Sequence, residues 1–214
     1  MFYTLVRVVY SFFITIFIPV YWKELGLVNF LWCCDITLFA LLVALWTKNN
    51  LLVSIGTICS LPLTILWNID FFSILIFNHS IFKIAHYMFY DFVPLYVRGL
   101  SLFHVWLPPL LIWLLYRWNY NRKAFIWSSF LTWIVIPITY LVTEPERNIN
   151  CVHSFIKAGQ NILPEWMLLI IFMTVLPIFV YYPMHWILKI LFSNKQESYL
   201  HTDQKMATAS DNSV

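Results

Sequence analysis

The sequence predicts an all-α protein: a polytopic membrane bundle of about six transmembrane helices with both termini in the cytoplasm. Hydrophobic residues make up 61% of the 214 residues and charged residues only 11%, whereas soluble domains carry roughly 25% charged residues. The apolar residues also gather in six long stretches, and a run of about 18 or more can cross a bilayer as a helix. We therefore expect an integral membrane protein, with a six-helix domain over residues 1–192.

The six apolar stretches are separated by short polar joints. We expect helices at residues 5–21, 27–46, 51–77, 95–116, 124–142 and 165–192. The third and sixth are longer than a bilayer requires, which predicts a tilt, a kink or an interfacial extension. The first lacks a small-x-small cleavage site, so we interpret it as a membrane helix and not as a signal peptide. Residues 193–214 are polar and aperiodic, which is typical of a disordered tail.

The distribution of Lys and Arg predicts the orientation, because cytoplasmic loops carry an excess of both. One side of the predicted bundle holds both termini and eight basic residues: Arg7, Lys48, Arg117, Arg122, Lys123, Lys189, Lys195 and Lys205. The opposite side holds five: Lys23, Lys83, Arg98, Arg147 and Lys157. Both termini are therefore placed in the cytoplasm, and the tail with them.

The stretch 94–116 (PLYVRGLSLFHVWLPPLLIWLLY) carries polar groups inside a membrane helix. Helical spacing places Arg98, Ser101 and His104 on one side, ahead of the Pro108-Pro109 pair. Ionisable groups at membrane depth are costly and normally face protein or water. His104 is therefore the first candidate for chemistry.

Two further ionisable groups fall at the depth of His104. Counted from the outer ends of their predicted helices, Asp35, Asp70 and His104 lie about seven to nine residues in, which is some 10–14 Å at roughly 1.5 Å per residue. Asn68 and Ser101 are close to the same level. Three costly side chains at one depth are explained most simply by a shared cavity that faces outward.

The residue types in this set favour acid–base chemistry. The pKa of a histidine lies near neutrality, so His104 suits a general base, and Asp35 or Asp70 could orient its ring. Arg98, near the mouth, would meet an anionic headgroup, and Ser101 and Asn68 would contact the substrate. The sequence contains no GxSxG elbow. No cofactor is expected, although a metal ion held by Asp35, Asp70 and His104 is a chemical variant of the same site.

Structural roles for the same residues remain open. Asp35 could pair with Arg98, and Asp70 could cap a helix break. The longest outer loop could cover the mouth of a cavity with Asn148, Asn150, Cys151 and His153, or could be a plain surface loop.

Composition also excludes several classes of function. The basic residues are scattered singly, so no nucleic-acid surface is expected. The cysteines, at positions 33, 34, 59 and 151, form neither a disulfide framework nor a zinc spacing. The expected partners are membrane lipids and a lipid-like substrate.

Two segments resemble known membrane families. WKELGLVNFLWCCDITLFALLVALW (residues 22–46) and LSLFHVWLPPLLIW (residues 100–113) resemble the second helix and the later H-x-x-x-x-P helix of the androgen-induced / androgen-dependent TFPI-regulating family of six-span membrane hydrolases. The resemblance implies that His104 corresponds to the catalytic histidine and Asp35 to the acid that ends the first motif. Trp32 stands where that family has its catalytic threonine, so its nucleophile does not carry over.

A second resemblance is closer. The WNxDF stretch at 67–71 and RGLSLFHxWLPP at 98–109 are similar to a group of bacterial six-span proteins of unknown function. This resemblance implies a bacterial cell (inner) membrane and no particular activity.

The leading hypothesis is an outer-facing intramembrane site that hydrolyses or transfers a lipid acyl ester or amide, with His104 as base. A carrier or binding protein for a small or protonatable solute is an alternative, although no inverted repeat is present. A structural membrane subunit, whose polar groups only join helices, is another.

Overall fold

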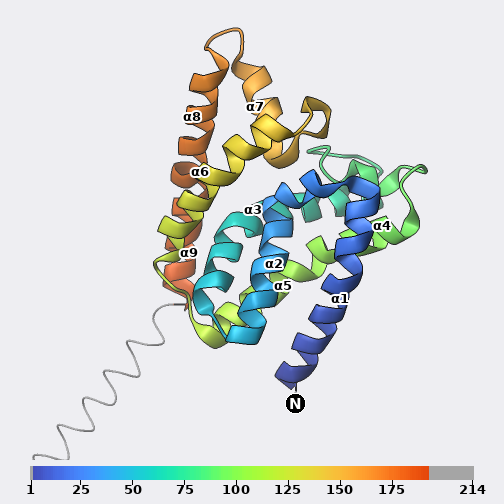
Figure 1. Cartoon of the computed structure of the whole chain (residues 1–214), viewed down its shortest axis with the longest axis vertical. Coiled ribbons are helices and arrows are strands. Elements are labelled where there is room, and N and C mark those ends of the chain that lie inside the picture. The colour runs from blue at the N-terminus through green and yellow to red at the C-terminus, as the bar shows by residue number, and fades with distance from the viewer. Residues whose placement is uncertain (1, 193–214) are drawn as a thin grey trace, which may run out of the picture.

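The computed structural model describes residues 2–192, and all regular structure within that range is helical (Figure 1). The predicted tail, 193–214, lies outside the described residues. Short 3₁₀ turns occupy 27–31, 86–89, 145–147 and 149–151, and a π-helical segment occupies 176–181. The α-helices are α1 (Phe2–Leu25), α2 (Cys33–Thr47), α3 (Asn50–Phe77), α4 (Leu95–Ser101), α5 (Phe103–Trp118), α6 (Ala124–Val142), α7 (Val152–Gly159), α8 (Glu165–Val175) and α9 (Tyr182–Phe192).

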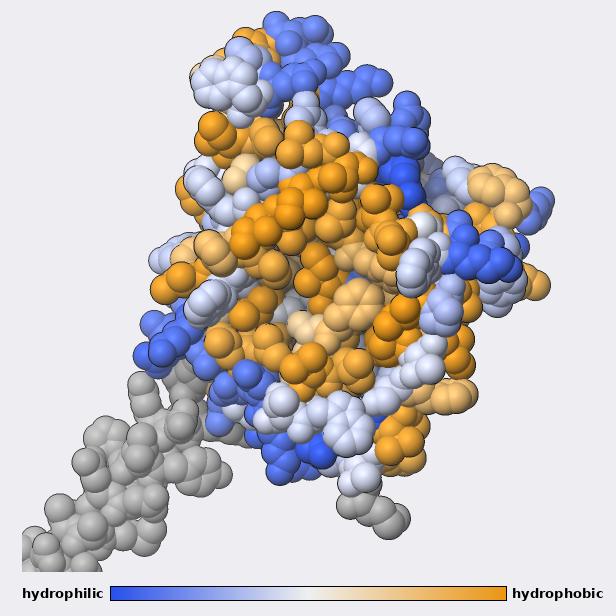
Figure 2. Space-filling view, in the orientation of Figure 1, coloured by the Kyte–Doolittle hydropathy of each residue, from blue (hydrophilic) through white to orange (hydrophobic). Residues whose placement is uncertain are grey.

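The predicted fold class is confirmed: the protein is an all-α polytopic membrane bundle. Five spans of the described chain are long and apolar enough to cross a bilayer, namely Tyr3–Leu25, Asn50–Phe77, Leu95–Trp118, Ala124–Val142 and Glu165–Phe192. Figure 2 shows hydrophobic residues over the middle of the molecule and hydrophilic residues gathered toward its ends. Such an apolar belt between polar ends is the surface expected of an integral membrane protein.

The ends of the described chain lie at the same end of the bundle. α1 begins and α9 finishes at the lower end of Figure 1, where the α2–α3 and α5–α6 connections also lie. The connections 78–94 and 143–164 lie at the opposite end. This arrangement agrees with an even number of crossings, and we refer to the upper end as the outer end, following the prediction from the loop charges.

α3 is the central helix and packs against α2, α5 and α6. Its contact with α2 is close at Gly56, where an added Cβ would lie 2.7 Å from Cγ2 of Thr37. Thr37 is buried and its hydroxyl donates to the carbonyl of Cys33 at 2.8 Å. A larger residue at position 56 would push α2 away from α3, and α2 carries Asp35.

The second predicted span is shorter than the apolar stretch 27–46 suggests, because α2 begins at Cys33. Gly26 adopts a positive φ of 78°, and residues 27–31 form a 3₁₀ turn in place of the first helical turns. Asn150, from the outer loop, holds the break: its Oδ1 accepts from the Cys33 amide at 3.0 Å, and its Nδ2 donates to the Leu31 carbonyl at 2.8 Å. At about 1.5 Å per residue, α2 alone rises about 22 Å, less than the hydrocarbon core of roughly 30 Å.

Two other predicted helices are interrupted. The helix expected at 95–116 is divided at Leu102 into α4 and α5. The last span contains the π-helical segment, which begins next to Pro177. Proline lacks the N–H that would continue the hydrogen-bond ladder, which accounts for the irregular segment beside it. The tilt, kink or interfacial extension expected from the length of this stretch stays a prediction.

Candidate functional site

A cavity of about 540 Å³ opens among the outer loops and reaches the starts of α2 and α5. Its lining includes the aromatic residues Tyr21, Trp32, Trp67, Tyr87 and Tyr90. Its polar lining includes three of the predicted site residues, Asp35, Ser101 and His104. A mostly apolar concave site with a few convergent polar groups is the usual form of a small-molecule or lipid site.

The break at Leu102 fixes the orientation of the His104 ring. The Val105 amide donates to the Leu102 carbonyl at 2.9 Å, which leaves the Ser101 carbonyl without its normal helical donor. Nδ1 of His104 lies 2.8 Å from that carbonyl oxygen. Because a carbonyl only accepts, Nδ1 carries the proton, and Nε2 of the neutral ring keeps its lone pair.

Aromatic stacking holds the same ring from both sides. The His104 ring lies between Trp67, with centroids 4.6 Å apart and an interplanar angle of 15°, and Phe103, at 4.0 Å and 26°. Nε2 of His104 has no hydrogen-bond partner among residues 2–192. The arrangement therefore presents a fixed, accessible nitrogen base to the cavity.

Asn68 supports His104 through the backbone. Pro108 has no N–H to donate to the His104 carbonyl, four residues earlier. The Nδ2 group of Asn68 donates to that carbonyl at 2.6 Å and to the Thr64 carbonyl at 2.7 Å. Asn68 does not line the cavity, so the structure places it behind the histidine as a helix-joining residue.

Asp35 lies in the first turn of α2 and is only 2% exposed. Asn29 donates through Nδ2 to its Oδ2 at 3.1 Å, and the Cys34 thiol lies 3.9 Å from Oδ1. Within the described chain the one ion pair joins Lys23 to Glu24, so no cationic side chain compensates Asp35. The carboxyl group thus faces the cavity with part of its hydrogen-bonding capacity unused.

Asp70 is placed differently. Its carboxyl group accepts five hydrogen bonds of 2.8–2.9 Å from the loop that follows α3: the Ser80 hydroxyl and the amides of Ile81, Phe82, Ile84 and Ala85. It does not line the cavity. The structure therefore brings Asp35 and His104 to one cavity and leaves Asp70 outside, engaged with its own loop.

Arg98 and Ser101 are also held by protein groups. Nε and Nη1 of Arg98 donate to the carbonyls of Val93 and Met88, at 2.9 and 3.3 Å, and Arg98 does not line the cavity. The Ser101 hydroxyl donates to the Val97 carbonyl at 3.0 Å and lies 2.6 Å from the Tyr21 hydroxyl. Ser101 lines the cavity, but its hydroxyl is not hydrogen-bonded to His104.

Several lining residues were not predicted from the sequence. Tyr21, Trp67 and Tyr87 belong to no recognisable motif, and nothing in the sequence distinguishes them from other aromatic residues of a membrane protein. Only the fold brings them together. Burial raises the pKa of the Tyr87 phenol, which neighbours Ser101 and the Trp67 indole, so Tyr87 is a neutral hydroxyl donor. Nε1 of Trp67 is buried without a hydrogen-bond acceptor among the described residues.

The longest outer loop contributes to the mouth of the cavity. Asn148 and Cys151 line it, together with Glu146 and Arg147 of the same loop. Arg147 donates to the Leu25 carbonyl, which ties the loop to the end of α1. Lys83 and His86 contribute from the connection 78–94. His153 bonds instead to the Thr143 hydroxyl, at 3.2 Å.

A metal site is not assembled from the described residues. No group of three or more His, Cys, Asp or Glu side chains within 2–192 is arranged to hold an ion. Asp70, one of the three ligands considered from the sequence, lies outside the cavity that Asp35 and His104 line.

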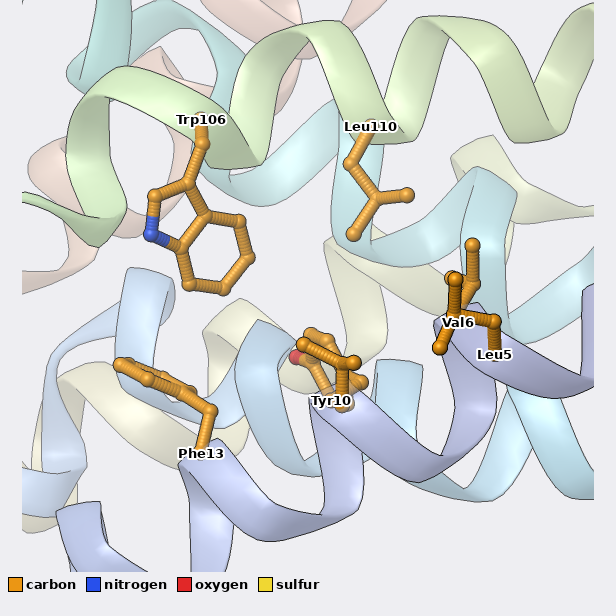
Figure 3. A pocket seen from close by; sticks show the side chains of 7 residues that line it. Leu5, Val6, Tyr10, Phe13, Trp106 and Leu110 are labelled. Atoms are coloured by element: carbon orange, nitrogen blue, oxygen red, sulfur yellow. The ribbon is translucent and has the colours of Figure 1, made fainter. Parts of the chain in front are cut away.

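A second hollow, of about 440 Å³, lies between α1 and α5 and has no chemistry of its own. Figure 3 shows the Trp106 ring and Leu110 pointing from α5 toward Phe13, Tyr10 and Val6 of α1. The lining is apolar and the hollow lies along membrane-spanning helices. It is therefore an ordinary hydrocarbon-facing groove between two helices.

Comparisons of the chain with protein-family models, with curated proteins and with solved structures find no match. The resemblances noted in residues 22–46, 67–71 and 98–113 stay predictions, and so do the catalytic and binding roles assigned from the sequence.

Proposed function

We propose that the protein is a membrane enzyme that hydrolyses or transfers the acyl group of a lipid ester or amide in the cavity around His104. The orientation of the His104 ring is the observation that carries this proposal. Nδ1 is bound to a backbone carbonyl, stacking fixes the ring plane, and Nε2 is left for an incoming group. A base held in this way is positioned for proton transfer to or from a reacting group.

Water is the nucleophile that this geometry favours for hydrolysis. Nε2 takes a proton from water as the water oxygen attacks the acyl carbon, and the imidazolium then returns that proton to the leaving oxygen or nitrogen. In transfer, an acceptor hydroxyl or amine takes the place of water. Ser101 is less suited to attack, because its hydroxyl is engaged with Val97 and Tyr21.

Donors on the cavity wall support charge development during such a reaction. The Trp67 N–H is buried without an acceptor, and Trp67 stacks on His104. Fixed donors aimed at a developing oxyanion are among the largest contributors to acyl-transfer catalysis. We assign this role to the neutral hydroxyl of Tyr87, which lines the cavity beside Trp67.

The first test is turnover of lipid esters and amides by the full-length protein in proteoliposomes, followed by mass spectrometry. We expect His104→Gln to lower the rate about 100- to 10,000-fold, the range typical of a lost general base. Ser101→Ala should retain most of the activity. His79→Ala is the matched control, because His79 is an exposed outer-loop histidine whose backbone carbonyl alone bonds to Ser73.

The outcome also separates the alternatives. If folded His104→Gln protein turns over lipid at the wild-type rate, His104 is not the base. If wild-type protein consumes no ester or amide, the enzyme proposal fails and a structural role for the polar groups is favoured.

We also infer that the protein resides in a bacterial cell membrane with both termini in the cytoplasm, which places the cavity on the outer side. The loop charges support this orientation. A green fluorescent protein fused after residue 214 should fluoresce, and alkaline phosphatase inserted in the exposed stretch 160–162 should be active. The reverse pair of results would place the cavity on the cytoplasmic side.

A further inference from the structure

We propose that the Asp35 end of the cavity binds an ammonium group, carried by the headgroup of the lipid on which the protein acts. This inference rests on the proposed function for its lipid source. The binding of the ammonium group itself depends only on Asp35 and the aromatic residues that line the same cavity.

The carboxyl group of Asp35 has no compensating positive charge in the described part of the protein. Asp35 is 2% exposed and receives one amide hydrogen bond, from Asn29, and a weak thiol contact from Cys34. A buried carboxyl group without a positive partner takes a proton and gives up its charge, and a bound cation would let it ionise. Within the described residues no Lys, Arg or His pairs with it, so the cavity is the remaining source of positive charge.

Aromatic residues form part of the cavity wall around Asp35. Tyr21, Trp32, Trp67 and Tyr87 line the cavity together with Asp35. The faces of aromatic rings attract cations, and rings combined with a carboxylate are the usual environment for amine and quaternary ammonium groups. A neutral acyl chain would fill these walls but leave Asp35 without a partner.

The charge of the lining residues changes between the two ends of the cavity. Asp35 is at the buried end, whereas Lys83 and Glu146 are exposed and Arg147 is half-buried at the mouth. The mouth therefore carries two cations against one carboxylate, and the interior carries one carboxyl group. A headgroup with an ammonium at its tip and a phosphate behind it matches this order of charges.

The test compares two probes of the same shape on full-length protein in maltoside micelles. Choline carries the positive charge, and 3,3-dimethyl-1-butanol is its neutral isostere. By isothermal titration calorimetry, we expect choline to bind at least tenfold more tightly than the isostere. Equal affinity for the two probes in the wild-type protein would overturn the inference, and this comparison requires no mutation.

Variants then assign the charge to Asp35. Asp35→Asn should reduce choline affinity to the level of the isostere, whereas Asp91→Asn, a change in an exposed loop residue that does not line the cavity, should leave it unchanged. His104→Gln should keep the preference for choline while losing turnover, which separates this inference from the proposed function. A folded Asp35→Asn protein that still prefers choline would contradict it.

A last pair of probes identifies the source of the ammonium group. Lysolipids with a phosphocholine or a phosphoglycerol headgroup share chain and phosphate and differ in the ammonium. Tighter binding of the phosphocholine lysolipid than of both free choline and the phosphoglycerol lysolipid supports a lipid headgroup. If free choline binds as tightly as its lysolipid, the lipid source is wrong and the site takes a soluble amine.

Discussion

Two buried aspartates, Asp35 and Asp70, fall at similar predicted depths, yet the structure surrounds them in opposite ways. Asp70 is 0% exposed and accepts five hydrogen bonds from one loop. Asp35 is 2% exposed, and its one conventional hydrogen bond comes from Asn29. The acceptor sites of Asp70 are filled by its own chain, so this carboxyl group stabilises the fold. Asp35 lines a cavity and has unused acceptor sites, so it is available to a ligand.

Of the substitutions considered, Asp70→Ala should reduce the stability of the protein most. The substitution leaves four backbone amides and the Ser80 hydroxyl without an acceptor, and each hydrogen bond to a charged group is worth about 1.5–3 kcal/mol. We expect a loss of at least about 3 kcal/mol in the free energy of unfolding, measured by denaturant titration in mixed micelles. Asp91→Ala, in the exposed loop nearby, should have little effect.

A stable Asp70→Ala protein that has lost lipid turnover would contradict the structural role of Asp70. Asp70 would then act on the substrate and not on the loop. If Asp70 acts only through the fold, Asp70→Asn and Asp70→Ala should lose activity in proportion to their loss of stability.

A second prediction concerns the support of His104. Asn68→Ala removes the donor to the His104 carbonyl, and we expect a cost of about 1–3 kcal/mol because that carbonyl is left unsatisfied. In a Pro108→Ala background the new amide of residue 108 can donate to the same carbonyl, so the cost of Asn68→Ala should fall. A double-mutant cycle measures this coupling. Strictly additive effects would show that Asn68 and Pro108 do not share the carbonyl.

The sequence alone predicts the fold class but not the residue at which α2 begins. The fold class follows from the length and spacing of the apolar stretches, and residues 124–142 form a helix with the predicted bounds. The later start of α2 was not predictable, because it depends on Asn150, more than one hundred residues away. Local apolar patterning carries no information about a cap supplied by a distant loop.

For the candidate site, the sequence predicts the depth of the residues but not which of them share a cavity. Depth along a helix follows from residue counting, which is why Asp35, Asp70 and His104 could be grouped. Direction around a helix and the path of the loops decide which groups share a cavity. The structure turns Asp70 toward the connection 78–94 and leaves Asp35 and His104 at the cavity. The aromatic walls were missed because one tyrosine or tryptophan in an apolar stretch resembles any other.

The smallest expected effect on stability is that of Asp35→Asn. The substitution keeps the shape of the side chain and an oxygen that can accept from Asn29, and it removes a carboxyl group that no cationic side chain within residues 2–192 contacts. We expect the free energy of unfolding to change by less than about 1 kcal/mol, measured by the same denaturant titration without added ligand. With choline present, the wild-type protein should gain stability in proportion to its occupancy and the variant should not. A large loss of stability without ligand would instead give Asp35 a role in the fold like that of Asp70, and the contrast between the two carboxyl groups would no longer hold.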